Sequence, residues 1–167
     1  DVLIVGGGVA GVSLLHALSS AGVDCLLIDA HGVGASGASS LPAALLNPHR
    51  GRTGRASVLD REGLGAVRRL VREVEADGYD SGARFEGVVR VASSARQAAM
   101  WSELAGPRRL TAVDVPPHVN APFGGMLIEE GGWLEPGRFL AALSGAALDR
   151  GARVIEHTTV RAVHSGR

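Results

Sequence analysis

Three glycines near the amino terminus have the spacing of a turn that binds a diphosphate. Gly6, Gly8 and Gly11 directly follow the apolar run at residues 2–5, and they precede a segment whose apolar residues recur every three or four positions. In such a turn the first glycine permits the tight bend, the second lets the main chain approach the phosphates, and the third lets the helix pack closely on the strand. The free N–H groups at the start of the helix then attract the anion.

Asp29 supplies the acid that such a site uses to bind a ribose. A second apolar run, at residues 23–28, ends at Asp29, 18 residues past Gly11. A carboxylate at this place accepts hydrogen bonds from the ribose hydroxyls of adenosine and repels a 2′-phosphate, and no arginine follows before Arg50. The order strand, turn, helix, strand predicts a βαβ unit with parallel strands. The ligand expected is an adenine dinucleotide, FAD or NAD(H) rather than NADP, and the spacing alone does not separate FAD from NAD.

The rest of the chain predicts an α/β fold in which the nucleotide-binding domain is interrupted. The expected elements are a short helix near 39–45, helices over 59–77, 95–104 and 136–150, strands at 85–92, 113–115 and 126–129, and a third core strand at 153–157. This order indicates a Rossmann-like domain with parallel core strands and part of a mixed α+β domain inserted into it. The predicted boundaries are 1–55 for the βαβ unit and its following loop, 56–130 for the insertion and 131–167 for the return.

Composition excludes several classes of protein. Seventeen arginines balance seventeen acidic residues over 167 residues, so the whole molecule has no net charge that would attract nucleic acid or an anionic membrane. The single cysteine, Cys25, cannot form an intrachain disulfide, which fits a reducing cytoplasm. No apolar run approaches the about 20 residues of a membrane helix, and the six scattered histidines predict no metal site. We therefore expect a cytoplasmic protein without a membrane span.

Two further stretches carry a resemblance to a known family. Residues 34–40 read Gly-Ala-Ser-Gly-Ala-Ser-Ser and residues 42–48 read Pro-Ala-Ala-Leu-Leu-Asn-Pro, while 131–136 read Gly-Gly-Trp-Leu-Glu-Pro ahead of a helix. With the amino-terminal turn, this pattern resembles the D-amino-acid oxidase-like family of FAD-dependent oxidoreductases. That family includes glycine oxidase, sarcosine oxidase, D-amino-acid dehydrogenase and the flavin domain of the enzyme that modifies the tRNA wobble uridine.

The resemblance implies FAD as the cofactor and a set of residues around it. The implied contacts are Gly6, Gly8, Val9, Ala10 and Gly11 at the pyrophosphate, Asp29 and Ala30 at the adenosine ribose, Ala38 and Ser39 at the pyrophosphate and ribityl chain, Ala44 and Leu45 near the isoalloxazine, and Val160 pairing its backbone with adenine. Small residues at 35–39 leave room for the cofactor. The family is longer than this chain, so the resemblance also implies that the C-terminal part of the fold, with the substrate-anchoring residues, lies outside it.

The resulting hypothesis is a flavoenzyme that oxidises the C–N bond of an amine or amino acid by hydride transfer to flavin. No acid, base or nucleophile is assigned within the chain. Two alternatives stay open: an NAD-dependent dehydrogenase domain, and a flavin domain that acts in tRNA wobble-uridine modification. The arginine-rich segment 49–55 would guide an anionic substrate or contact RNA phosphates, although we interpret it as a solvated loop.

Overall fold

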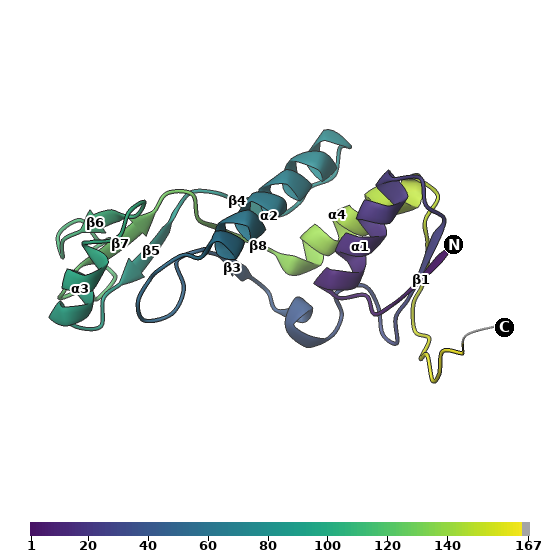
Figure 1. The fold of residues 1–167 in the computed structure, drawn as a ribbon, viewed down its shortest axis with the longest axis horizontal. Coiled ribbons are helices and arrows are strands. Elements are labelled where there is room, and N and C mark those ends of the chain that lie inside the picture. The colour runs from purple at the N-terminus through teal and green to yellow at the C-terminus, as the bar shows by residue number, and fades with distance from the viewer. Residues whose placement is uncertain (165–167) are drawn as a thin grey trace. The chain divides into compact units, whose positions relative to one another are not determined.

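The computed structural model describes residues 1–164 (Figure 1). The chain divides into two units. Unit 1 contains residues 1–44, 69–83 and 134–167, and unit 2 contains residues 45–68 and 84–133. The chain thus enters unit 2 and returns to unit 1 twice. The expected α/β class with a parallel sheet is confirmed, and the described residues contain four α-helices. The roles assigned to 1–55, 56–130 and 131–167 stay predictions.

A three-stranded parallel sheet forms the centre of unit 1. Strands β1 (Val2–Val5), β2 (Cys25–Ile28) and β9 (Arg153–Ile155) lie in the order β1-β2-β9, and β1 pairs with β2 from Val2↔Cys25 to Val5↔Ile28. Helix α1 (Val9–Ser20) connects β1 to β2. The predicted βαβ unit is therefore present, and the third core strand joins it at β2, although it ends at Ile155 rather than His157.

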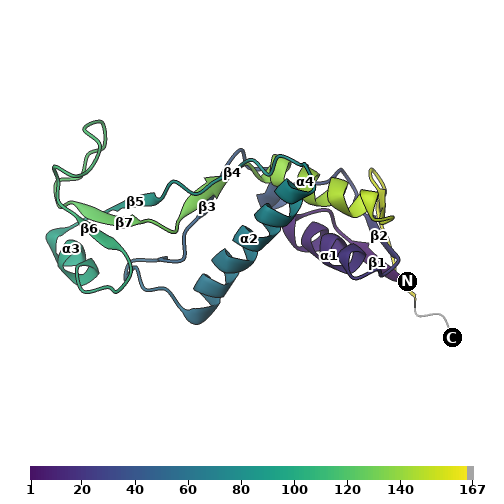
Figure 2. The same ribbon diagram turned by 90° about the horizontal axis from the view of Figure 1, so that it is seen from above.

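Two helices cover one face of this sheet. Helix α4 (Pro136–Asp149) lies beside α1 in both views (Figures 1 and 2). Ile4 and Leu27 are buried, as are the apolar side chains that the helices turn inward: Val12, Leu15, Phe139, Leu140 and Leu143. Successive strand residues point to opposite faces, so Leu3 and Val5 lie on the other face, where they are 49% and 56% exposed. The sheet of unit 1 is thus packed on one side.

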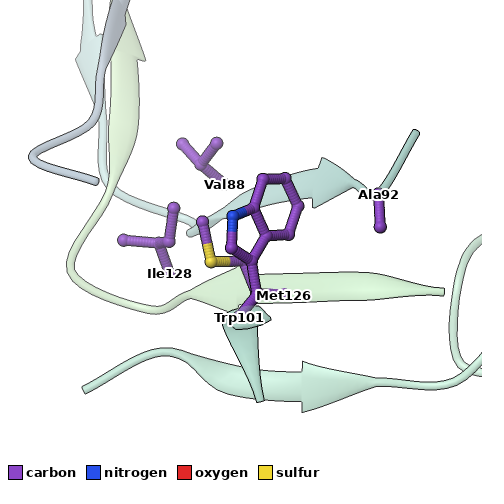
Figure 3. Packing of buried hydrophobic residues seen from close by; sticks show 5 residues of the cluster. All are labelled: Val88, Ala92, Trp101, Met126 and Ile128. Atoms are coloured by element: carbon purple, nitrogen blue, oxygen red, sulfur yellow. The ribbon is translucent and has the colours of Figure 1, made fainter. Parts of the chain in front are cut away.

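Unit 2 is built on a three-stranded antiparallel sheet. Strands β5 (Val88–Val91), β7 (Gly125–Ile128) and β6 (Arg108–Leu110) lie in the order β5-β7-β6. Helix α3 (Ala95–Trp101) begins after Ser94, whose hydroxyl accepts a hydrogen bond from the Gln97 N–H at 3.2 Å. One core cluster of this unit consists of Val88, Ala92, Trp101, Met126 and Ile128, with the Trp101 indole beside the Met126 side chain (Figure 3).

Short strands lie where the chain passes between the units. They are β3 (Ala44–Leu46), β8 (Gly132–Leu134) and β4 (Ala83–Arg84), in the order β3-β8-β4. Helix α2 (Val58–Ala76) matches the helix expected over 59–77, and its buried residues are Val71 and Val74. Among the described residues, no helix has the length and apolar character to cross a membrane.

Two predicted elements are wrong. Residues 113–115 form no strand, because the Asp114 carboxylate accepts hydrogen bonds from the Thr111 N–H and hydroxyl and closes a turn there. The third strand of the antiparallel sheet in unit 2 is β6, and no strand was predicted for its residues. The helix expected near 39–45 is a 3-10 turn, η1 (Gly37–Ser40), followed by β3, because Pro42 and the extended backbone at Leu41 end the helical turn.

Helix α4 contains two glycines that test its packing. A methyl group at Gly145 would lie 2.4 Å from Cε1 of Tyr79, whose hydroxyl donates a hydrogen bond to Asp149 at 2.6 Å, whereas nothing lies within 4 Å of a methyl group at Gly137. We expect Gly145→Ala to lower the free energy of unfolding by about 1–3 kcal/mol through overpacking. The control Gly137→Ala should be neutral or stabilising by up to about 1 kcal/mol. Urea unfolding followed by circular dichroism measures both, and equal stability of the two variants would contradict this packing.

Candidate functional site

The amino-terminal turn depends on glycine at two positions. Gly6 has φ +109°, a conformation that favours glycine, and its N–H donates to the Ile28 carbonyl at 2.9 Å. A Cβ atom at Gly11 would lie 1.9 Å from the Gly6 carbonyl oxygen, so helix α1 can approach the turn this closely only with glycine there. Gly8 differs, since a Cβ atom on it would meet only the Ser39 hydroxyl, at 3.4 Å. The fold therefore requires glycine at Gly6 through its backbone conformation and at Gly11 through close packing, whereas a Cβ atom at Gly8 would make only an ordinary van der Waals contact.

The start of helix α1 is open to an anion. Gly8 precedes the helix and contributes no capping side chain, and the first turn contains no acidic residue. Val9 is 55% exposed, and its N–H donates to the Ser39 hydroxyl at 3.1 Å. Ala10 is also exposed. The first N–H groups of a helix have no partner within it and carry the positive end of the helix dipole, so a phosphate is favoured here.

Asp29 lies at the mouth of this turn, as its spacing predicts. Its carboxylate accepts hydrogen bonds from the Gly7 N–H at 2.6 Å and from the His31 N–H at 2.8 Å. The Gly7 N–H, and after it the His31 N–H, holds the pKa of the Asp29 carboxyl below its usual value. The side chain is therefore ionised at neutral pH, and each of its oxygens keeps a further lone pair for a ribose hydroxyl.

The loop after β2 forms a second wall of the site. The Gly34 N–H donates to the Gly7 carbonyl at 2.9 Å, and the Val33 N–H donates to the Glu156 carboxylate at 2.8 Å. Ala38 is exposed and Ser39 is half-buried. A hollow of about 550 Å³ lies beside Ser39 and is lined by Gly34, Ala35, Ser39, Ser40, Leu41, Pro42, Glu135, Gly137 and Arg138. The predicted small residues therefore border open space, with no large side chain among them filling it.

The remaining predicted contacts are placed as follows. Ala30 is exposed beside Asp29, and the segment after β9 runs along this place, because the Thr158 N–H donates to the Asp29 carbonyl at 2.9 Å. Val160, two residues further on, is half-buried. Ala44 belongs to unit 1 and Leu45 to unit 2; Leu45 is 65% exposed. The cofactor contacts of Ala30, Ala44, Leu45 and Val160 stay predictions.

Sequence reasoning missed three residues of this site. Glu156 fixes the loop at Val33, and Glu135 and Arg138 lie at the edge of the hollow, joined to each other at 2.8 Å. Pro136 was the available signal for Glu135 and Arg138. Proline there predicts the start of a helix that packs on the parallel sheet, so residues at its first turn lie near the site. Among residues 1–164, no three His, Cys, Asp or Glu side chains are grouped so that they could hold a metal ion.

Comparison with known proteins decides the family. The profile of one family, described as DAO, FAD dependent oxidoreductase, matches residues 1–167. The chain belongs to this family of FAD-dependent oxidoreductases. The expected fold and cofactor, FAD rather than NAD, are thereby confirmed, and the cradle fits that cofactor: open main chain at Gly8, an ionised Asp29 and a loop of small residues. The NAD-dependent alternative is set aside.

The similar proteins are of two kinds. The tRNA 5-methylaminomethyl-2-thiouridine biosynthesis bifunctional protein MnmC of Maricaulis maris (strain MCS10) is 36% identical over 158 residues, which cover 92% of this chain and 24% of that protein. The crystal structures of glycine oxidase from Geobacillus kaustophilus and from Bacillus cereus are 26% and 25% identical, with TM-scores of 0.76 and 0.80. They match 96% and 99% of this chain, and 47% and 50% of those chains. The chain thus spans about a quarter of one relative and half of the others.

Gly8 and Gly11 separate cofactor binding from folding. In Gly8→Val the added γ-methyl groups enter the space for the phosphates, so flavin content should fall by more than about tenfold, the effect of about 1.4 kcal/mol, while the melting temperature changes little. In Gly11→Ala the methyl group collides with the Gly6 carbonyl oxygen, so both melting temperature and flavin content should fall. Visible absorbance per mole of protein and thermal melts measure the two effects. Normal flavin content in Gly8→Val would count against this site.

Asp29→Asn tests the ribose contact and the ionised carboxylate. Loss of a charged hydrogen bond, about 1.5–3 kcal/mol, should weaken FAD binding by roughly tenfold to a hundredfold. Because the folded-state pKa of Asp29 is lowered, its carboxylate stabilises the fold above the unfolded pKa of about 4, and this contribution is lost as pH falls through the folded value. The stability difference between wild type and Asp29→Asn should therefore shrink below about pH 4.

The control for this measurement is Asp24→Asn. Asp24 is an exposed acid just before the same strand, and it pairs with Arg153 at 3.1 Å. The control should retain flavin. Equal loss of flavin in the two variants, measured by titration of the apoprotein with FAD, would show that general charge rather than the position of Asp29 matters.

Proposed function

We propose that the protein oxidises the C–N bond of an amine or amino acid with FAD. The likeness to glycine oxidase over 96–99% of this chain supports this proposal, together with membership of the FAD-dependent oxidoreductase family. Bound FAD would supply a hydride acceptor for the carbon next to the nitrogen. Loss of that hydride would give an imine, which water hydrolyses. The observation that carries the proposal is the open turn at Gly8 with the ionised Asp29 beside it.

The proposed task of unit 1 is to hold and orient the cofactor. The N–H groups at the start of α1 would bind the diphosphate, Asp29 would bind the ribose, and the loop around Ala38 and Ser39 would border the extended part of the molecule. Ala44 and Val160 of unit 1, with Leu45 at the start of unit 2, complete the proposed set. Unit 2 is proposed as part of the substrate domain. We also propose a cytoplasmic location, which the single, free and buried Cys25 supports.

A second candidate is the same oxidation carried out on a modified tRNA nucleotide. It is favoured by the 36% identity over 158 residues to a protein whose name assigns it to tRNA 5-methylaminomethyl-2-thiouridine biosynthesis. The bond broken is again a C–N bond, so the two candidates share the cofactor and differ in the molecule that carries the amine.

Anaerobic mixing of the full-length flavoprotein with candidate amines tests both. Loss of the oxidised flavin's visible absorbance with glycine or sarcosine would support the first candidate. The same loss with tRNA that carries an aminomethyl-uridine derivative, and not with unmodified tRNA, would support the second. A protein that is purified without flavin and cannot be reconstituted with FAD would contradict both.

A further inference from the structure

The neutral chain consists of two units of opposite charge. Unit 2 carries ten arginines and seven acidic residues, whereas unit 1 carries seven arginines and ten acidic residues. Three of the unit 2 arginines fall within residues 50–55. The zero net charge of the whole chain therefore does not describe the electrostatics of unit 2. This unit carries an excess of positive charge, which attracts anions.

The segment 49–55, which we call the arginine loop, is fixed to unit 2 by its carbonyl groups. Arg90 donates to the carbonyls of His49 and of Gly51, the latter at 2.8 Å. The Gln97 amide and the Trp101 indole N–H each donate to the Arg52 carbonyl at 2.9 Å. The buried His49 ring contacts the Gly54 carbonyl through Nδ1 at 2.7 Å. A solvated loop would leave these carbonyls to water, so this loop is held in one conformation.

Close packing under the loop explains the glycine at position 54. A Cβ atom at Gly54 would lie 2.9 Å from the Trp101 Nε1 atom and 3.0 Å from the Met126 Cε atom, and the residue has φ +66°. Trp101 and Met126 belong to the buried core of unit 2 (Figure 3). The Arg90 guanidinium also lies 4.8 Å from the centre of the Trp101 ring. The core of unit 2 thus supports the loop directly.

The carbonyls face inward while the arginine side chains stay outside. Arg52, Arg55 and Arg96 are exposed, and within residues 1–164 none of them has a carboxylate oxygen within 4 Å. Arg50 differs, since it pairs with Asp60. The hydrogen bonds stabilise the loop, but leaving its cations unpaired gains nothing for stability, because like charges repel each other.

A hollow lies between the loop and helix α3. It has a volume of about 520 Å³ and is lined by Arg52, Ser93, Ser94, Arg96, Gln97 and Met100. The two guanidiniums come from different elements. At the same rim the Ser93 hydroxyl already donates to the Gln97 amide oxygen at 2.9 Å, whereas the Ser94 hydroxyl accepts from the Gln97 N–H and keeps its own proton to donate. Arginine with hydroxyl groups is the usual donor set for phosphate oxygens.

We propose that the arginine loop and the start of α3 bind the phosphodiester groups of an RNA strand. Two exposed guanidiniums hold a single small anion weakly, because exposed ion pairs contribute little. Three unpaired guanidiniums at Arg52, Arg55 and Arg96, spread over a loop and a helix, instead favour a ligand that carries several phosphates. The proposal deepens the second candidate function, since it places the RNA on unit 2, and it rests on that candidate for the choice of RNA.

The test is RNA binding by the full-length flavoprotein as salt is varied. Anisotropy of a labelled single-stranded RNA is measured for wild type and for the triple variant Arg52→Gln, Arg55→Gln, Arg96→Gln. A single strand contributes a slope of about −0.7 per phosphate contact in a plot of log affinity against log salt, so the triple variant should lower the slope by about 2 and weaken binding about tenfold or more at low salt. The matched control is Arg69→Gln, Arg72→Gln, Arg109→Gln, which removes the same charge from exposed positions elsewhere and should weaken binding less than about twofold.

Further arms separate the explanations. Trp101→Phe keeps the charge and the aromatic ring but removes the N–H that holds the Arg52 carbonyl, so RNA affinity should fall although net charge does not change. Unchanged affinity and slope in the loop triple variant, or equal loss in the control triple variant, would overturn the proposal. Displacement of the RNA by millimolar inorganic phosphate, at a slope of a single contact, would also overturn it in favour of a small-anion site. Flavin content, read on the same samples, tests the proposed function independently.

Discussion

The hydrogen bond from the Gly7 N–H to the Asp29 carboxylate, 2.6 Å long, is the contact on which the cofactor site depends. It joins the turn after β1 to the end of β2, and it orders the main chain at the mouth of helix α1. The same carboxylate accepts the His31 N–H, which aligns the start of the following loop. The same main-chain donors lower the pKa of Asp29, so one side chain shapes the turn and offers negative charge at the place proposed for a ribose.

The glycines around this contact differ in the reason for their presence. At Gly6 and Gly11 the need for glycine comes from the fold, because one has positive φ and the other lies against a carbonyl oxygen. At Gly8 the structure leaves room for a side chain, so the fold itself does not require glycine there. The proposed reason for glycine at this position is the approach of the cofactor phosphates to the main chain.

Local patterns predicted the parts of the fold that local forces decide. The βαβ unit, the position of Asp29 and helices α2 and α4 follow from periodicity, glycine and proline positions within short windows. Residues 113–115 have strand-forming side chains, but Asp114 closes a turn with Thr111, and the edge strand forms at β6 instead. The roles of Glu135, Arg138 and Glu156 depend on contacts between distant parts of the chain.

The arginine loop shows the same limit more strongly. Its composition is typical of a solvated segment. That interpretation is wrong for its main chain, because Arg90, Gln97 and Trp101 donate hydrogen bonds to its carbonyls. The pattern within the segment could not predict this, because these donors lie about 40 to 50 residues later in the sequence. Nothing within residues 49–55 indicates that the carbonyls are bound while the Arg52 and Arg55 side chains are unpaired. Charge counted over the whole chain likewise conceals the opposite signs of the two units.

A crystal structure of the full-length protein with FAD bound tests the central claim most directly. We expect diphosphate oxygens within hydrogen-bond distance of the main-chain N–H groups at the start of α1, the diphosphate in the space that a side chain at position 8 would enter, and a ribose hydroxyl on the Asp29 carboxylate. A diphosphate bound elsewhere, or an Asp29 that is turned away from the ribose, would contradict it.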